Sequence, residues 1–380
     1  MSAAAAPRYR AIDVLRGMTV ALMIVVNMSL SETLSFAPLL HSAWDGFTLT
    51  DAVFPTFLFV VGASLAFTAE RYAREGAAAY ARRIGNRSLR IFLCGLVVSN
   101  FPFFTIVHGH IVVQPVETIR IMGVLQRIAL AYLIAAGLLY RVSWRGVLAY
   151  SAAALIGAEL VAQFGGDHSL TGNAAARIDY ALLGAGHLYQ LEGAPFDPEG
   201  LLGTIPASVN LLAGYLATRF LRHRAAIGAN RSSGGIATRD LLAMTGVGLA
   251  LMLGALMLKT GIPINKKLWS ISYTLLTIGI DVVLLAAMVQ IVDRWSVRAG
   301  TAYFELFGKN ALVVYMVAEL AMNMGWTLHI GATPLLRWVY DTGFAWIGGK
   351  TASLVYALVF TQACWMLAWF LDRRRIYVRL

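Results

Sequence analysis

Long apolar runs separated by polar segments dominate the chain. A transmembrane helix needs about 20 apolar residues to cross a hydrocarbon core of roughly 30 Å. Suitable runs lie at residues 12–30, 52–69, 88–106, 119–140, 143–164, 200–220, 240–258, 270–292, 303–325 and 350–371. They are continuous, whereas barrel strands alternate over about ten residues. The pattern therefore predicts an all-α, polytopic membrane protein with about ten transmembrane helices in one domain, 1–380.

Composition and the placement of charge orient these helices. The chain is 58% hydrophobic and only 13% charged, with a net charge of +11. The segments between the runs lie alternately on the two sides of the membrane. Of the 31 Lys and Arg residues, 22 lie on the same side as both termini, six lie on the other side and three lie within the runs. The positive-inside rule places the first set in the cytoplasm, so the segment carrying His41 lies outside. The basic excess is thus a topology signal, and we expect no nucleic-acid partner.

Three connecting segments have distinct compositions. Residues 165–200 are too polar to span but rich in aromatic and aliphatic residues, so we expect them to pack over the outer face. Residues 326–349 are expected to form an interfacial or partly re-entrant piece. Residues 219–239 are expected to be a flexible cytoplasmic linker. The first run follows a charged N-terminus without a clear small-residue cleavage site, which favours an uncleaved span over a signal peptide.

Polar side chains gather on the outer side of the predicted bundle. The stretch "LLHSAWDGFTLTDAVFPTFLFVVG" places His41, Trp44, Asp45 and Asp51 just ahead of an apolar run. Carboxylates before a helix are often caps, and a tryptophan there is often an interface anchor. Two more polar clusters, however, lie on the same outer side. Asp197 and Glu199 precede the sixth run, and Asn265, Lys266 and Trp269 precede the eighth. Their grouping on one membrane face predicts a site for a polar, extracytoplasmic substrate.

Several polar residues lie within the runs, where each needs a partner or a function. Asn27 lies in the outer half of the first run, where interhelical hydrogen bonding is the alternative to a role in the site. Arg127, beside Gln126, should either pair with a carboxylate such as Asp51, Asp281 or Glu319, or bind an anionic ligand. The remaining candidates are Arg16, which can pair with Asp13 on one helical face, and the adjacent Lys309 and Asn310.

Five blocks of the sequence resemble a known family. They are "RAIDVLRGMTVALMIVVN", the stretch containing His41, "IRIMGVLQRIALAY", "FDPEGLLGTIPA" and "PINKKLWSISY". In this order they are similar to blocks of the heparan-α-glucosaminide N-acetyltransferase family and its bacterial relatives. The resemblance implies transfer of an acetyl group from cytoplasmic acetyl-CoA to the amine of a glucosamine across the membrane, with His41 at the reaction centre. Animal members carry a luminal domain ahead of this core, so we expect a cell-envelope amino sugar and a bacterial cytoplasmic membrane here.

The residues themselves suit this chemistry. Histidine titrates near neutrality and can act as a base toward the amine or form an acyl-imidazole, and the sequence leaves both routes open. Asp51 or Asp45 could orient the imidazole, and Asn27 could donate to the developing oxyanion. Basic and amide side chains suit the CoA phosphates and pantetheine. The candidates are Arg16, Gln126, Arg127, Lys309 and Asn310.

A competing function is secondary transport of a polar or anionic solute. Intramembrane Arg and Asp residues and glycine-interrupted spans are also typical of transporters. Against it, the two halves show no internal repeat, and the polar residues gather at the outer face. Cys94 and Cys364 lie in apolar runs, so neither a disulfide nor a metal site is predicted. The acceptor, the kinetic order and the oligomeric state, including a homodimer, stay open.

Overall fold

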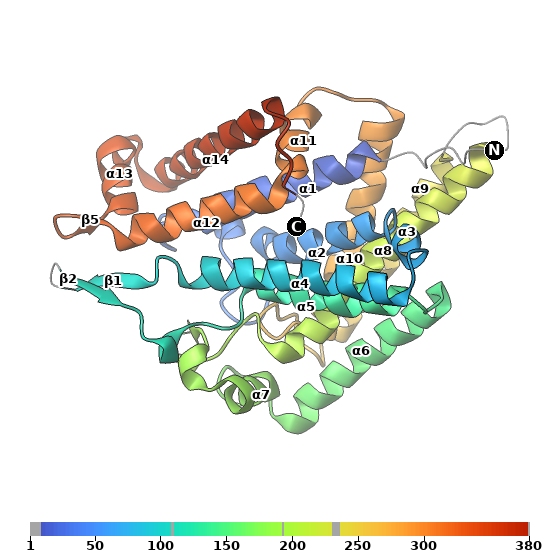
Figure 1. The fold of residues 1–380 in the computed structure, drawn as a ribbon, viewed down its shortest axis with the longest axis horizontal. Coiled ribbons are helices and arrows are strands. Elements are labelled where there is room, and N and C mark those ends of the chain that lie inside the picture. The colour runs from blue at the N-terminus through green and yellow to red at the C-terminus, as the bar shows by residue number, and fades with distance from the viewer. Residues whose placement is uncertain (1–8, 108–109, 192–193, 230–235, 379–380) are drawn as a thin grey trace.

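The computed structural model describes residues 9–107, 110–191, 194–229 and 236–378. Each predicted run coincides largely with helix, as Figure 1 shows. The long helices are α1 (Arg10–Asn27), α2 (Leu49–Leu65), α4 (Ala77–Asn100), α5 (Val124–Leu139), α6 (Trp144–Gly165), α8 (Leu201–Ala229), α9 (Thr238–Leu258), α10 (Ile271–Met288, continued by a π-turn, Val289–Arg294), α12 (Ala311–Thr327) and α14 (Gly349–Arg373). Shorter helices are α3 (Ala69–Ala73), α7 (Ala174–Leu183), α11 (Thr301–Lys309) and α13 (Leu335–Gly343).

The helical class is confirmed, together with a membrane character. Within the described residues, five helices are long and apolar enough to cross a bilayer: α6, α8, α9, α10 with its π-turn, and α14. Three shorter apolar helices, α2, α5 and α12, accompany them. The number of about ten spans and the orientation of these spans stay predictions.

Three short antiparallel hairpins interrupt the helices. They are β1 (Phe104–Val107) with β2 (His110–Val113), β3 (Gln190–Leu191) with β4 (Ala194–Pro195), and β5 (His329–Ile330) with β6 (Thr333–Pro334). The prediction of one apolar span over 88–106 was therefore wrong at its C-terminal end. Helix α4 ends at Asn100 because Phe101 precedes Pro102, and the residue before a proline disfavours helical geometry. The following β-branched residues pair as strands instead.

Other boundaries also differ from the sequence prediction. Helix α5 begins at Val124 rather than near 119, so Arg120 lies in an extended segment ahead of it. The ninth run is broken at Asn310, which separates α11 from α12. Within the predicted linker, α8 continues to Ala229. Residues 230–235 of that linker lie outside the described residues.

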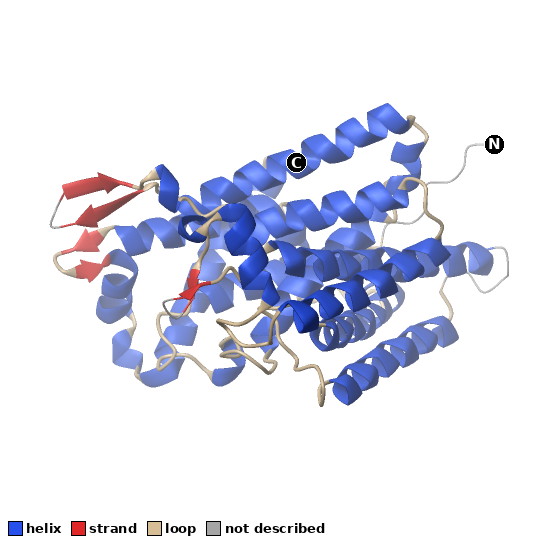
Figure 2. Cartoon of the chain, turned by 90° about the horizontal axis from the view of Figure 1, so that it is seen from below, coloured by secondary structure: helices blue, strands red, loops and turns tan. Residues whose placement is uncertain are grey.

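Most of the long helices run roughly along the long axis of the molecule, and several connections lie at its two ends (Figure 1). The hairpin β1–β2, the hairpin β5–β6 and α13 lie at one end, and α3 and the beginning of α1 lie at the other (Figure 1). A view turned by 90° again places the strands toward one end (Figure 2). The β5–β6 hairpin and α13, within the segment 326–349 expected outside, therefore lie at one end of the bundle, and α3, expected inside, lies toward the opposite end (Figure 1).

Close backbone contacts hold α2 at the centre of the bundle. A Cβ atom on Gly62 would lie 1.7 Å from the carbonyl oxygen of Leu211, and one on Gly214 would lie 1.9 Å from that of Phe59. Small residues allow this approach of α2 and α8, as is common between helices in membranes. Helix α2 therefore cannot shift along α8 without a clash, which fixes the position of Asp51 at its beginning.

Candidate active site

The first turn of α2 holds a carboxylate under the preceding loop. Thr48 is the N-cap of α2, and Asp51 completes a capping box with it. The Oδ2 atom of Asp51 accepts hydrogen bonds from the backbone N–H of Thr48 at 3.0 Å and from that of Ser42 at 3.1 Å. From α10, the hydroxyl of Tyr273 donates to the carbonyl oxygen of Asp51 at 2.7 Å. The Asp51 side chain is thereby buried with one oxygen, Oδ1, directed toward His41.

His41 contacts that oxygen through Nδ1. Its Nδ1 lies 2.8 Å from Asp51 Oδ1, and its side chain is 49% exposed whereas that of Asp51 is 1% exposed. An ionised carboxylate only accepts hydrogen bonds, so we assign the proton to Nδ1. The lone pair of the neutral ring is then on Nε2. This pairing confirms the predicted contact between the histidine and Asp51, and Asp45 does not take that position.

Lys266 brings a positive charge to the same imidazole from the loop before α10. Its Nζ lies 2.9 Å from His41 Nδ1, 3.4 Å from Nε2 and 3.6 Å from Asp51 Oδ1. Burial lowers the pKa of Lys266, while the charges of Asp51 and Glu199 act in the opposite direction. Lys266 is among the residues predicted to bind the substrate, and the structure brings it into direct contact with His41.

The two outer loops that carry these residues are joined to each other. Asn265 donates to Asp45 at 3.0 Å. The N–H of Gly46 donates to the carbonyl oxygen of Ile264 at 2.8 Å. Trp44 donates from Nε1 to the carbonyl oxygen of His168 at 2.7 Å, which connects the loop to the segment after α6. Asp45, Asn265 and Trp44 therefore have structural partners within the loops that surround His41.

Trp269 and Arg127 form a buried layer beneath these loops. Trp269 is 2% exposed and donates from Nε1 to Asn210 Oδ1 at 3.0 Å. The guanidinium of Arg127 lies over its ring, 4.9 Å from the centroid, and donates from Nη2 to the carbonyl oxygen of Gly200 at 3.0 Å. Arg127 is 1% exposed, yet its Nε and Nη1 have no hydrogen-bond partner within the described part of the chain. Two donors of a buried cation are thus unused.

The carboxylates ahead of α8 pair with Arg120. Arg120 forms ion pairs with Asp197 at 2.8 Å and with Glu199 at 2.7 Å. Burial lowers the pKa of Arg120, but these two carboxylates outweigh it and raise the pKa overall. Arg120 lies in the run 119–140 predicted to be one helix, but α5 begins only at Val124, so Arg120 does not share a helical face with Arg127. The extended backbone instead lets Arg120 reach the segment before α8.

Asn27 lies at the C-terminal end of α1 and is exposed. Its Nδ2 donates to Glu319 Oε1, in α12, at 2.6 Å. Because a carboxylate accepts, this contact fixes which side of the Asn27 amide carries the nitrogen. One N–H of the amide faces Glu319, and the second remains for another acceptor.

The five residues expected to bind CoA fall into two groups. Arg16 bonds to Asp13 at 3.0 Å and to the carbonyl oxygen of Gly308 at 3.2 Å. Lys309 and Asn310 follow Gly308 directly and hold the C-terminal segment, through Asp372 at 2.9 Å and the carbonyl oxygen of Ile376 at 3.1 Å respectively. Gln126 and Arg127 form the other group, at the beginning of α5. The structure therefore does not bring all five together.

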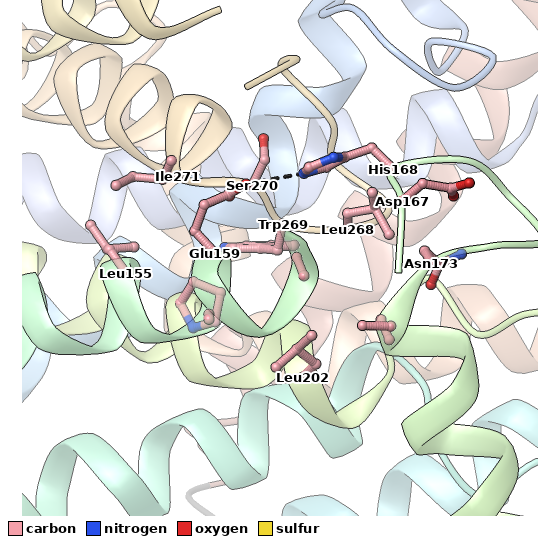
Figure 3. Close-up of a pocket in the computed structure, with 15 residues that line it drawn as sticks. Leu155, Glu159, Asp167, His168, Asn173, Leu202, Leu268, Trp269, Ser270 and Ile271 are labelled. Atoms are coloured by element: carbon pink, nitrogen blue, oxygen red, sulfur yellow. Dashed lines mark hydrogen bonds and ion pairs between the residues drawn. The ribbon is translucent and has the colours of Figure 1, made fainter. Parts of the chain in front are cut away.

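A pocket lies beside the His41 loop, between α6, α7, the beginning of α8 and residues 268–271 (Figure 3). Glu159 of α6 approaches His168, with 3.0 Å between Oε1 and Nε2. Trp269 also lines this pocket. The hydrogen bond from Trp44 to the His168 backbone connects the His41 loop to one wall of this pocket.

Sequence reasoning missed several residues of this region. Tyr273, which supports Asp51, lies within an apolar run and gives no distinct signal. Asn210 and Glu159, by contrast, are polar residues within predicted spans, and that pattern alone marks them for attention. The ion pairs of Arg120 with Asp197 and Glu199 join segments far apart in the sequence and leave no local signal.

Comparison with known proteins identifies the family. A family model described as "Heparan-alpha-glucosaminide N-acetyltransferase, catalytic" matches residues 8–247. The chain is 26% identical over 377 residues to the human heparan-alpha-glucosaminide N-acetyltransferase and 28% identical over 376 residues to that of the mouse, matches that cover 83% and 84% of this chain. It spans about half the length of these relatives, 53% and 54%. With most of its length matched by the family model, the chain belongs to the heparan-alpha-glucosaminide N-acetyltransferase family.

Proposed function

We propose that this protein is a transmembrane acetyltransferase. It moves an acetyl group from cytoplasmic acetyl-CoA to the amine of a glucosamine-type sugar on the extracytoplasmic side. The observation that carries the proposal is the half-exposed imidazole of His41, held by the buried Asp51 at 2.8 Å. The family match and the names of the human and mouse relatives support acetyl transfer to a glucosamine.

The chemistry centres on His41 Nε2. In one route, Nε2 attacks the thioester carbonyl, the C–S bond breaks with its electron pair on sulfur, and the acetyl-imidazole then acylates the amine. In the other, the amine attacks directly and Nε2 takes its proton. The thiolate of CoA receives the proton that the amine loses in either route. Asp51 keeps the Nδ1–H tautomer, and the second N–H of Asn27 would donate to the developing oxyanion.

The acceptor would bind among the polar residues of the outer loops. An amino sugar carries an ammonium and several hydroxyls, so carboxylates, amides and indole rings suit it. The proposed acceptor-binding residues are Trp44, Asp45, Asp197, Glu199, Asn265, Lys266 and Trp269. Contacts between the loops 41–48 and 263–270 support this, because they gather most of these residues around His41.

The donor would reach His41 through the bundle from the other side. Arg16, Lys309 and Asn310, grouped at the contact of α1 with α11, are proposed to receive the CoA phosphates. Gln126 and the unused donors of Arg127 are proposed to bind nearer the thioester. This arrangement requires both termini in the cytoplasm and His41 outside, in a bacterial cytoplasmic membrane. The separation of the connecting segments to two ends supports it.

Radiolabelled acetyl-CoA tests the proposal directly. The purified protein in detergent should transfer label to a glucosamine-containing acceptor and release one thiol for each acetyl group transferred. His41→Ala should bind acetyl-CoA and transfer nothing. Label retained on the protein after a single turnover without acceptor indicates the acetyl-imidazole route. Uptake of a solute into proteoliposomes without thiol release would instead establish the transporter.

A further inference from the structure

Lys266 is placed to do more than bind the acceptor. Its Nζ is within 3.4 Å of both imidazole nitrogens of His41. An atom in the ring plane at these distances from both nitrogens would overlap a ring carbon, so the ammonium lies over the face of the imidazole. It therefore leaves the in-plane lone pair of Nε2 unobstructed, and the nitrogen remains open to the thioester or the amine.

We propose that Lys266 is a catalytic residue of the acetyl transfer, whose ammonium stabilises the negative charge that develops on the thioester carbonyl oxygen. This inference rests on the proposed function. As the carbonyl carbon is attacked, an electron pair moves onto its oxygen, and that pair returns when the C–S bond breaks and the thiolate leaves. The carbonyl oxygen stands off the line of attack, so it can lie on the side of the ring that faces Lys266.

Burial opposes the positive charge of Lys266, and the nearby carboxylate of Asp51 stabilises it. Asp51 Oδ1 is 3.6 Å from Nζ, and the Lys266 side chain is 16% exposed. The other charged groups that act on it are Glu199 and Arg127, of opposite sign to each other. A partly buried ammonium with limited access to water interacts more strongly with a developing oxyanion than a solvated one does. Lys266 would act in addition to the hydrogen bond proposed for Asn27.

Replacing the charge should slow the chemical step. We expect Lys266→Met, which keeps most of the side-chain length, to lower kcat by roughly 10² to 10³, the range seen for single oxyanion donors. The KM for acetyl-CoA should change much less. Lys266→Arg should recover part of the loss because it keeps the charge. Lys259→Met is the matched control, since this exposed lysine lies in the same loop and its loss changes the net charge equally.

A second measurement distinguishes a catalytic role of Lys266 from a structural role beside Asp51. In dithioacetyl-CoA, sulfur replaces the carbonyl oxygen and accepts hydrogen bonds poorly. If Lys266 contacts that oxygen, the substitution in the donor and Lys266→Met should produce losses that are not additive. Additive losses would overturn the proposal, as would a Lys266→Met kcat close to that of the wild type.

Failure of the role proposed for Lys266 can be distinguished from failure of the proposed function. A wild-type protein that transfers no acetyl group would refute the function itself. A wild-type protein that is active, with His41→Ala inactive and Lys266→Met unimpaired, would refute only the role of Lys266.

Discussion

Asp51 holds the imidazole of His41 and begins α2 at the same time. One carboxylate oxygen accepts from Nδ1 of His41, while the other accepts from the N-cap residue Thr48. The imidazole is therefore tied to the beginning of a helix whose backbone contacts α8 directly. This makes the tautomer of His41 a consequence of how α2 is capped.

Asp51→Asn should separate these two roles. The asparagine oxygen can still accept from the N–H of Thr48, so we expect the protein to fold. Its amide nitrogen would face His41 and favour the tautomer that carries hydrogen on Nε2. That tautomer removes the lone pair, and kcat should fall by about 10³-fold or more. Steady-state kinetics beside a thermal unfolding curve would show this, and a fully active Asp51→Asn would refute the orienting role.

Asn27→Ala should slow turnover without a large effect on donor binding. The expected loss is that of an oxyanion donor, roughly 10² to 10³ in kcat. Glu319→Gln provides a comparison, because a glutamine can present either its oxygen or its nitrogen to Asn27 and no longer fixes the amide orientation. We expect an intermediate loss for Glu319→Gln. Equal turnover in the wild type and Asn27→Ala would leave Asn27 as an interhelical contact only.

Arg127→Lys should weaken donor binding in a folded protein. Lysine keeps the charge beside Glu199 and Asp197 but lacks the Nε and Nη1 donors that are unused in the structure. Loss of one hydrogen bond to a charged group costs about 1.5–3 kcal/mol, which is roughly 10- to 150-fold in the Kd for acetyl-CoA. Isothermal titration measures this. An unchanged Kd in a folded variant would remove Arg127 from the donor site.

The helices and the contact between His41 and Asp51 could be predicted from the sequence because both depend on residues close together in the chain. Apolar run length is a property of contiguous residues, so the positions of the helices follow from it. His41 and Asp51 are ten residues apart, and Gly46, with a φ of 125°, allows the loop between them to fold back. The predicted contact required no knowledge of the rest of the bundle.

Contacts between distant segments were not predictable in the same way. Lys266 is 225 residues from His41, and the order of spans does not determine which helices become neighbours. Arg120 was assigned to a helix because apolar composition continues through residues 119–123, whereas the helix begins at Val124. Its ion pairs with Asp197 and Glu199 depend on that extended backbone. Hydrophobicity alone does not distinguish the two conformations.

Cysteine labelling should establish the membrane topology. The exposed Thr33 serves as the outer position and the exposed Ala299 as the cytoplasmic one. In a background lacking Cys94 and Cys364, an impermeant maleimide applied to intact cells should label Thr33→Cys only. Ala299→Cys should become reactive after the membrane is opened. Labelling of both from outside would contradict the proposed orientation.

The stability of the protein should depend on pH through Asp179. This residue of α7 is fully buried; its Oδ1 accepts from the N–H of Leu201 at 2.9 Å, and its Oδ2 has no hydrogen-bond partner among the residues described. Burial raises its pKa to about 6, against the opposing effects of the Leu201 N–H and the charge of Arg127. The folded protein therefore retains a proton on Asp179 in a pH range where the unfolded chain has lost it.

The direction of the effect follows from this difference. The contribution of Asp179 to the free energy of unfolding is complete below pH 4 and is lost as the pH rises through about 6. A shift of two pKa units corresponds to about 3 kcal/mol at most. We expect Asp179→Asn to remove this part of the slope, because asparagine stays neutral and keeps an oxygen for the Leu201 N–H. Asp167→Asn, at an exposed carboxylate, should leave the slope between pH 5 and 7 in place. Denaturant unfolding in detergent across pH 4 to 8 measures both, and parallel curves for the wild type and Asp179→Asn would show that Asp179 is ionised in the folded protein.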